Sequence, residues 1–151
     1  MKEKIIEIVG FNMEHERATK KQIIMDSKNQ IQNREIKFRA FQDNQMLESP
    51  ISSNYGLQRF FGFLYEDTPI MQYTGLNDAE INGNEVYEGD IIENCDTKNL
   101  QLVYWNEDKS AWYCRYFNDE THIVSLSESI GNLNKVIGNI YQNADLLQFA
   151  F

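Results

Sequence analysis

No stretch of this sequence has the length and apolarity of a membrane-spanning helix. Such a helix needs about 20 consecutive apolar residues, and no run in the chain approaches that length. The apolar patch near the N-terminus, residues 5–9, is interrupted by Glu7 and is followed by charged residues. A secretory signal needs a longer apolar stretch and a small-residue cleavage site. We therefore expect a cytoplasmic protein that has no membrane partner.

Cysteine and histidine are scarce, with two residues of each. Cys95 and Cys114 are 19 residues apart and form no Cys-x-x-Cys pair, so the cysteines do not indicate a metal site. Without an export signal we expect two reduced thiols that pack as small buried apolar side chains. A Cys114–His122 dyad across neighbouring strands would provide a nucleophile and a base. No acid or amide that would orient the histidine is evident, so the sequence favours a packed cysteine and an exposed histidine.

The signatures of the common catalytic and cofactor sites are also missing. The chain contains no Gly-x-Ser-x-Gly, no phosphate-binding loop, no Gly-x-Gly-x-x-Gly and no His-Glu-x-x-His. We therefore predict no catalytic residues, no metal ligands and no cofactor. The sequence favours a protein that is not an enzyme.

Positive charge is in short supply after residue 33. Residues 1–33 carry six Lys/Arg against five Asp/Glu, whereas residues 34–151 carry eight against 18, a net charge of −10. A body this acidic repels phosphate backbones unless its few cations cluster. The charge therefore disfavours non-specific nucleic-acid binding, and an acidic surface of this kind suits a basic partner.

The first 33 residues also differ from the rest in pattern. Apolar residues recur at helical spacing around Ile24 and Ile31, the remainder is polar, and Gly10 interrupts an earlier periodic segment. We interpret residues 1–33 as an N-terminal extension that is either a docked helix or a disordered arm. Its ordering would depend on packing against the body or against another subunit.

From residue 34 onward the pattern becomes that of β-strands. Aromatic residues make up 13% of the chain, and aromatic and β-branched residues favour strands. Seven or eight short segments of this kind follow one another between turn residues, without intervening helices. The segments lie in REIKFRAFQ (34–42), RFFGFLYEDTPIMQYTGL (59–76), INGNEVYEG (81–89), DIIENC (90–95), LQLVYW (100–105), AWYCRYF (111–117), HIVSLS (122–127) and LNKVIGNIY (133–141).

This pattern predicts a mainly β domain over residues 34–151, a small SH3-like barrel or sandwich of short antiparallel strands. ESPISSNYG (48–56) is interpreted as a loop, and NEDKS (106–110) as the loop of an antiparallel hairpin. ADLLQFAF (144–151) is expected to form a closing helical turn that packs Leu146, Leu147 and Phe149 on the barrel end.

Residues 78–89, DAEINGNEVYEG, superficially resemble a calcium-binding loop. Such a loop needs oxygen ligands at positions 1, 3 and 5, a glycine at 6 and a bidentate glutamate at 12. Counting from Asp78, position 12 is Gly89, and the flanking segments are strand-like. Asn82-Gly83 is instead a strong signal for a two-residue hairpin turn. We therefore predict a turn with solvated acidic side chains, followed by a second break at residues 88–90.

Three carboxylates near this turn leave an acid/base site open as a weaker alternative. Glu85, Glu88 and Asp90 are close enough in sequence for two of them to face each other, as a carboxylate-dependent hydrolase would require. No His, Lys or Arg within seven residues would tune them. Solvated acidic surface is the favoured interpretation.

An aromatic and basic face is the candidate binding surface. Strand-borne aromatics with interleaved cations stack single-stranded bases in some proteins. The competing interpretation is that the aromatics fill the barrel while the cations are solvated on its outside. The candidate face consists of Lys37, Arg39, Tyr73, Tyr87, Glu88 and Asp90.

Four motifs, taken together and in order, resemble the YopX family of phage and prophage proteins. They are REIKFRAF (34–41), MQYTGLND (71–78), NGNEVYEGDII (82–92) and VIGNIYQN followed by ADLL (136–147). The resemblance covers residues 34–147, whereas in the family's usual pattern the first motif lies almost at the start. It implies a mostly β, barrel-containing fold and a home in a temperate phage or prophage of a Gram-positive host. It implies no established activity and no agreed catalytic residues.

The function expected from these observations is that of an accessory, non-enzymatic protein-binding module. Its partner would be a host or phage protein, and self-association through the N-terminal arm is also expected because unpaired strand edges are usually covered. The alternative is a single-stranded nucleic-acid-binding protein that uses Lys37, Arg39 and Tyr73.

Overall fold

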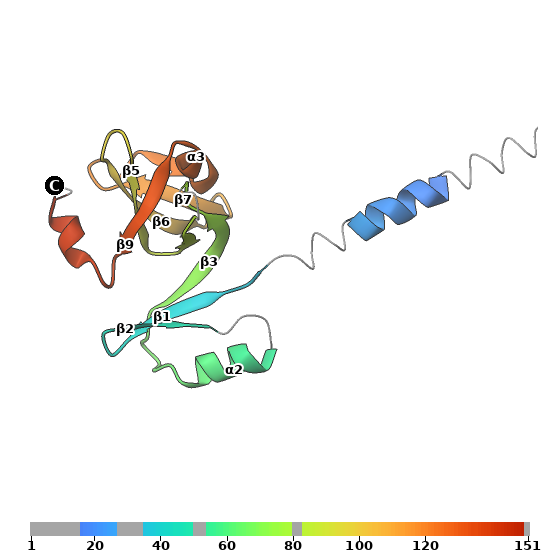
Figure 1. Cartoon of the computed structure of the whole chain (residues 1–151), viewed down its shortest axis with the longest axis horizontal. Helices are drawn as coiled ribbons and strands as arrows, with labels where there is room; N and C mark the ends of the chain where they lie inside the picture. Colours follow the sequence, from blue (N-terminus) through green and yellow to red (C-terminus); the bar gives the residue numbers. More distant parts are fainter. Residues whose placement is uncertain (1–15, 27–34, 50–53, 80–82, 150–151) are drawn as a thin grey trace, which may run out of the picture. The chain divides into compact units, whose positions relative to one another are not determined.

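The computed structural model describes residues 16–26, 35–49, 54–79 and 83–149. The chain divides into two compact units, Met1–Glu35 and Ile36–Phe151. In the first unit residues 16–26 form a helix, hereafter the N-terminal helix, drawn in blue in Figure 1. Within it, the Gln22 side-chain amide donates a hydrogen bond of 2.9 Å to Asp26 one turn later. This confirms that the N-terminal segment is helical in part.

The second unit is built mainly from short antiparallel strands, which confirms the predicted fold class. Its strands are β1 (Phe38–Gln42), β2 (Gln45–Glu48), β3 (Ile70–Asn77), β4 (Glu85–Tyr87), β5 (Asp90–Asn94), β6 (Leu100–Asn106), β7 (Ala111–Tyr116), β8 (Ile123–Ser125) and β9 (Asn134–Asn139). Its helices are α2 (Asn54–Gly62), α3 (Leu126–Gly131) and the 3-10 helix η1 (Ala144–Phe149). In the described part of the chain, no helix combines the length and the apolarity needed to cross a membrane.

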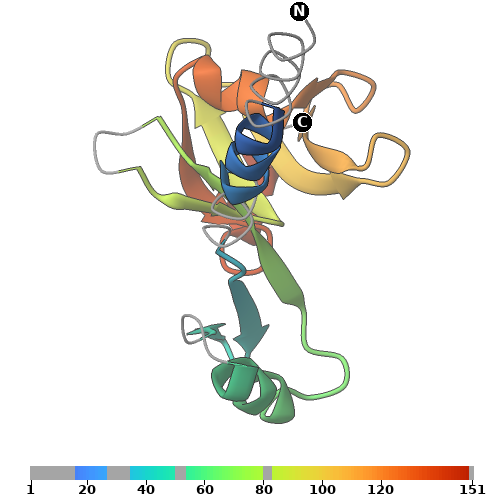
Figure 2. The same ribbon diagram turned by 90° about the vertical axis from the view of Figure 1, so that its right-hand side faces the viewer.

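A four-stranded sheet has the order β2-β1-β3-β4. Strands β1 and β2 form a tight hairpin through Asp43 and Asn44, whose φ angles of 52° and 60° lie in the left-handed region. Hairpin turns of two residues need this conformation, and Asp and Asn tolerate it. Strand β2 forms one edge of the sheet, and α2 lies beside β1 and β2 (Figures 1 and 2).

A five-stranded sheet of order β8-β7-β6-β5-β9 curls into half a barrel (Figure 1). Its concave side holds the main core, to which the short strand β4 and the helix α3 also contribute. The Ser125 hydroxyl caps the N-terminus of α3 by accepting a hydrogen bond from the Glu128 amide at 3.3 Å. The fully buried side chains of this core are Val86, Ile92, Val103, Cys114 and Leu126.

Two local predictions in this half-barrel are confirmed. Strands β6 and β7 form the predicted antiparallel hairpin, with Trp105 opposite Trp112 in the register. The C-terminal segment forms the expected closing turn, η1, in which Leu146 is partly buried. The predicted contacts of Leu147 and Phe149 lie outside the described side chains.

The segment over residues 54–62 was predicted as a loop that leads into a strand, and that prediction is wrong. The structure forms the helix α2 there. Leu57, Phe60, Phe61 and Leu64 recur at helical spacing, and the Phe61 ring packs edge-on against Phe38 of β1 at 5.2 Å between centroids. The aromatic content suggested a strand, but the period of the apolar residues is that of a helix.

Residues 78–89, which superficially resemble a calcium-binding loop, include the connection between the antiparallel strands β3 and β4, as predicted. However, β3 ends at Asn77 and β4 begins at Glu85, so the connection is longer than a two-residue hairpin. Asn82 itself lies outside the described residues. The second break is confirmed: Gly89 has a φ of 78° immediately before β5, a conformation that favours glycine. Among the described residues, no group of three or more His, Cys, Asp or Glu side chains could hold a metal ion.

Candidate functional site

The structure brings most of the predicted binding face together. Tyr73 of β3 and Tyr87 of β4 are opposite one another in the strand register, and their ring centroids are 5.5 Å apart. The Lys37 ammonium lies 5.2 Å from the centroid of the Tyr73 ring. The Arg39 guanidinium lies 4.5 Å from the centroid of the Tyr87 ring. Two cations on β1 and its N-terminal flank are thus stacked on two tyrosines, as in many cation–π pairs.

Both cations of this face are engaged by carboxylates that are remote in the sequence. Lys37 forms an ion pair with Glu85, and Arg39 forms one with Asp90. The Lys37 and Arg39 side chains are only 11% and 13% exposed. The interpretation that these cations are solvated on the outside of the barrel is therefore wrong, because the tyrosine rings and carboxylates cover them.

Tyr87 joins the two ion pairs. Its hydroxyl donates a 2.8 Å hydrogen bond to Glu85, and its backbone amide donates a 2.7 Å bond to Asp90. We call Lys37, Arg39, Glu85, Tyr87 and Asp90 the ion-pair cluster. It links β1 and its flank to β4 and β5.

The sequence predicted that the acidic side chains around residues 78–90 are solvated. This prediction is wrong for two of them. Asp90 is fully buried, and Asp78 is 6% exposed. Asp78 accepts hydrogen bonds from the Asn84 amide at 2.8 Å, from the Asn84 side chain at 3.0 Å and from the Val136 amide at 3.0 Å. It therefore ties the β3–β4 connection to β9. Glu88 is half-buried, and its backbone amide donates a 2.9 Å hydrogen bond to the Gln72 carbonyl. This contact does not bring its carboxylate into the cluster.

The environments of these groups shift their pKa values in different directions. Burial raises the pKa of Asp90 to about 6, in spite of the Arg39 charge and the Tyr87 amide. Burial also acts to raise the pKa of Glu85, but hydrogen bonds from Lys37 and Tyr87 outweigh it and lower the pKa. Burial and the neighbouring Glu85 raise the pKa of the Tyr87 phenol, and burial raises the pKa of Glu88. At neutral pH the cluster therefore contains two ionised carboxylates, each held against a cation.

The raised pKa of Asp90 predicts a pH-dependent stability. An aspartate in an unfolded chain has a pKa of about 4, so between about pH 4 and pH 6 the folded protein keeps a proton that the unfolded chain has released. The free energy of unfolding should therefore fall as the pH rises through this window, by on the order of 1–3 kcal/mol from this group. Urea unfolding between about pH 4.5 and about pH 7.5 should show the wild type losing stability relative to Asp90→Asn. A difference that does not change with pH would contradict this.

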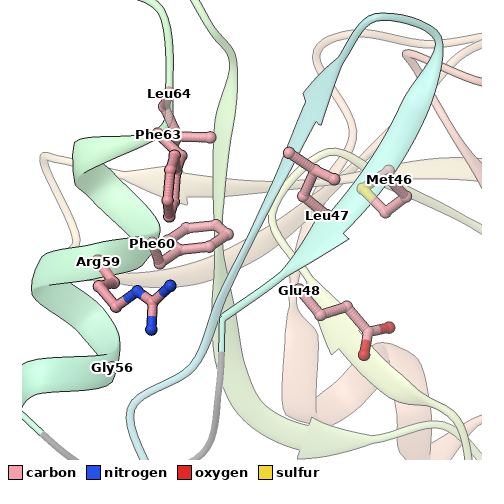
Figure 3. Close-up of a pocket in the computed structure, with 8 residues that line it drawn as sticks. All are labelled: Met46, Leu47, Glu48, Gly56, Arg59, Phe60, Phe63 and Leu64. Atoms are coloured by element: carbon pink, nitrogen blue, oxygen red, sulfur yellow. The ribbon is translucent and has the colours of Figure 1, made fainter.

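A second candidate site, which the sequence did not indicate, is an apolar groove between β2 and α2. Its volume is about 770 Å³. Figure 3 shows Phe60 pointing from α2 toward the strands, with Phe63 just beyond the end of the helix. Phe60 is buried, whereas Phe63 is 68% exposed. The groove is lined by Met46, Leu47, Glu48, Gly56, Arg59, Phe60, Phe63 and Leu64.

Few charged groups border this groove. Of its lining residues only Glu48 and Arg59 are charged, and the Arg59 guanidinium lies 5.9 Å from the centroid of the Phe63 ring. Strand β2, which carries Leu47, is an edge of its sheet, and none of the described strands pairs with its other side. The helical spacing of Leu57, Phe60 and Leu64 was the signal in the sequence that could have indicated this surface.

The cysteines do not form a catalytic dyad with histidine. Cys114 is buried opposite Val124 in the strand register, and burial raises its pKa to about 12. His122 is exposed and stacks on the Tyr116 ring at 4.4 Å between centroids, as the favoured interpretation predicted. Both thiols are free. The expectation that both are buried is wrong for Cys95, which is exposed in the turn after β5.

Comparison with known proteins identifies the family. The model of the YopX family, described as YopX protein, matches residues 1–148. The chain therefore belongs to the YopX family. The match is longer than the region 34–147 over which the four motifs occur, and it includes the N-terminal helix.

Among solved structures, one that is similar to this chain can be described. It is the crystal structure of protein EF1440 from Enterococcus faecalis, which is 21% identical, with a TM-score of 0.48. The similarity covers 74% of this chain and 97% of that chain. A search of curated proteins found no match.

Proposed function

We propose that this member of the YopX family is a non-enzymatic accessory protein that binds a partner protein through the groove between β2 and α2. We place it in the cytoplasm of a bacterium that carries the phage or prophage, with a host or phage protein as the partner. The observation that carries the proposal is the groove itself, an apolar hollow beside an open strand edge. Apolar hollows of several hundred cubic ångströms that stay open to solvent commonly bind a ligand or a protein segment.

Exposed apolar side chains are frequent in the segment that contributes Phe60, Phe63 and Leu64 to the groove. Phe61, Phe63, Tyr65 and Ile70 are 39%, 68%, 60% and 44% exposed. Burial of such exposed side chains by a partner would be favourable, at roughly 25 cal/mol per Å² of apolar surface removed from water. Aromatic residues at protein interfaces often contribute most of the binding free energy.

The two alternatives have less support. Binding of single-stranded nucleic acid through Lys37 and Arg39 would require both cations to leave their carboxylate partners, of which Asp90 is fully buried, in a unit of strongly negative charge. A hydrolase based on Glu85 and Asp90 would have to use carboxylates that are already held by those cations. No contact among the described residues specifically favours nucleic-acid binding or hydrolysis.

Photo-crosslinking from inside the groove tests the proposal. A benzophenone amino acid would replace Phe63 in the full chain, and a matched chain would carry it at Trp105, an aromatic residue of β6 that is 43% exposed. We expect a discrete protein adduct from position 63 but not from position 105. Leu47→Asp should weaken that adduct by about tenfold, because a carboxylate in an apolar contact is costly. Mass spectrometry would show which segment of the partner is attached.

Two results would contradict the proposal. One is the absence of any adduct from position 63 in cells that express the chain at its natural level. The other is the same set of adducts from positions 63 and 105, because non-specific collisions would produce that pattern.

A further inference from the structure

The N-terminal helix presents apolar side chains to solvent at its C-terminal end. Ile23, Ile24 and Met25 are 59%, 57% and 51% exposed. Three consecutive residues cover an arc of about 200° on a helix of 3.6 residues per turn. This apolar end is about one turn long. The whole N-terminal helix spans residues 16–26, and a helix that short is only marginally stable alone in water. A surface that covers its apolar end would stabilise it.

The charges of the helix and of the second unit are complementary. Residues 16–26 carry three Lys/Arg against two Asp/Glu, whereas residues 36–151 carry seven against 17. The cations Arg17, Lys20 and Lys21 all precede the apolar end of the helix. Complementary charge of this kind guides association and selects orientation.

Exposed acidic side chains lie in the turns next to one end of the groove, the end at which Phe63 and Leu64 lie (Figure 3). They are Asp43, in the turn after β1, and Glu66 and Asp67, in the turn after α2, whereas Glu48 lies toward the opposite end. The Tyr65 hydroxyl donates a hydrogen bond to Asp43 at 3.3 Å, so these two turns are adjacent. An apolar hollow with an acidic end fits a helix whose apolar turn follows a basic one.

We propose that the groove between β2 and α2 binds the N-terminal helix of a second copy of this chain. The proposal rests on the proposed function of the groove and names its occupant. Ile23, Ile24 and Met25 would enter the apolar part, while the basic turn faces the acidic end. The groove would thus recognise the apolar end of a helix, and not a continuous apolar face with anchors at i, i+3 and i+4. Because each copy has one helix and one groove, a two-fold dimer would fill both grooves with identical contacts.

Pairwise crosslinking of full-length chains tests this occupant. One chain would carry Met25→Cys and the other Phe63→Cys, both with Cys95→Ser so that buried Cys114 is the remaining native thiol. A size tag on one chain distinguishes the mixed dimer. We expect a short bismaleimide to join the two chains about tenfold faster than it joins Met25→Cys to a Trp105→Cys control, because bound groups have a high effective concentration.

Light scattering provides a second measurement. The wild type should be a dimer, and Ile24→Asp should be a monomer with an unchanged circular dichroism spectrum of the β unit. A monomeric wild type, or crosslinking that is no faster than in the control, would overturn the inference. A crosslink that forms only within one doubly substituted chain would overturn it as well.

These experiments distinguish a failure of this inference about the N-terminal helix from a failure of the proposed function of the groove. If the adduct of position 63 contains a different protein and the wild type is a monomer, this inference fails and the proposed function stands. If position 63 gives no adduct of any kind, both fail.

Discussion

Replacing Arg39 by methionine should lower the free energy of unfolding by about 3 kcal/mol at neutral pH. Methionine keeps much of the apolar stem of the side chain, but it removes the guanidinium that lies over Tyr87 and leaves the buried carboxylate of Asp90 without its cation. Removing one partner of a buried ion pair typically costs about 3–5 kcal/mol, because the remaining charge is desolvated and unpaired. Urea unfolding monitored by tryptophan fluorescence would measure the loss.

A second substitution distinguishes the loss of the pair from a loss of packing. Adding Asp90→Asn to Arg39→Met should restore most of the lost stability, since the asparagine carbonyl can still accept the Tyr87 amide and no charge remains buried. Lys98→Ala serves as the control, because Lys98 pairs with Glu93 on the surface at 3.2 Å and is 64% exposed. That change should cost less than about 1 kcal/mol. A double variant no more stable than Arg39→Met would contradict this account.

Replacing Asp78 by alanine should cost about 2–4 kcal/mol. The change leaves the amides of Asn84 and Val136 without their acceptor, and a buried donor that loses its partner costs about 1–3 kcal/mol. Because Asp78 joins the β3–β4 connection to β9, the loss should also be visible locally. Amide hydrogen exchange of Val136, measured by NMR, should accelerate more than that of core residues in β6.

Two further variants test whether the lost hydrogen bonds cause the destabilisation by Asp78→Ala. Asp78→Asn keeps one carbonyl acceptor and should lose less stability than the alanine variant. Asp96→Ala removes an exposed acid of the same charge and should change the free energy of unfolding by no more than about 0.5 kcal/mol. Equal losses from Asp78→Ala and Asp96→Ala would show that net charge, and not these hydrogen bonds, is responsible.

Much of the β architecture could be predicted from local sequence, because strand and turn preferences are local. The alternation in the β6 and β7 segments, with a polar loop between them, is sufficient for that hairpin. Asp43-Asn44 and Gly89 mark turns because few other residues adopt a left-handed backbone at low cost. The helix α2 was not predicted because phenylalanine is common in strands. The aromatic composition of the segment was given more weight than the helical spacing of its apolar residues.

The interactions of the candidate face could be predicted only in part. The two tyrosines and two cations were identified, but whether a strand residue faces water depends on which segment covers it. Glu85 and Asp90 are 48 and 51 residues from Lys37 and Arg39, and sequence spacing carries no information on such partners. The groove was missed for the same reason, since it exists only where α2 packs beside β2.

The strand connectivity has a consequence for the order in which the protein assembles and opens. Strands β5 to β8 pair with their sequence neighbours, so these four strands of the half-barrel require only the closure of short loops, whereas β9 pairs with β5 across at least 40 residues. The ion-pair cluster must instead close loops of about 50 residues, which form late because their entropic cost precedes any contact. In native fluctuations the sheet around β1 and β2 is therefore expected to detach before the half-barrel does. The surface that carries the groove belongs to the least protected part of the second unit.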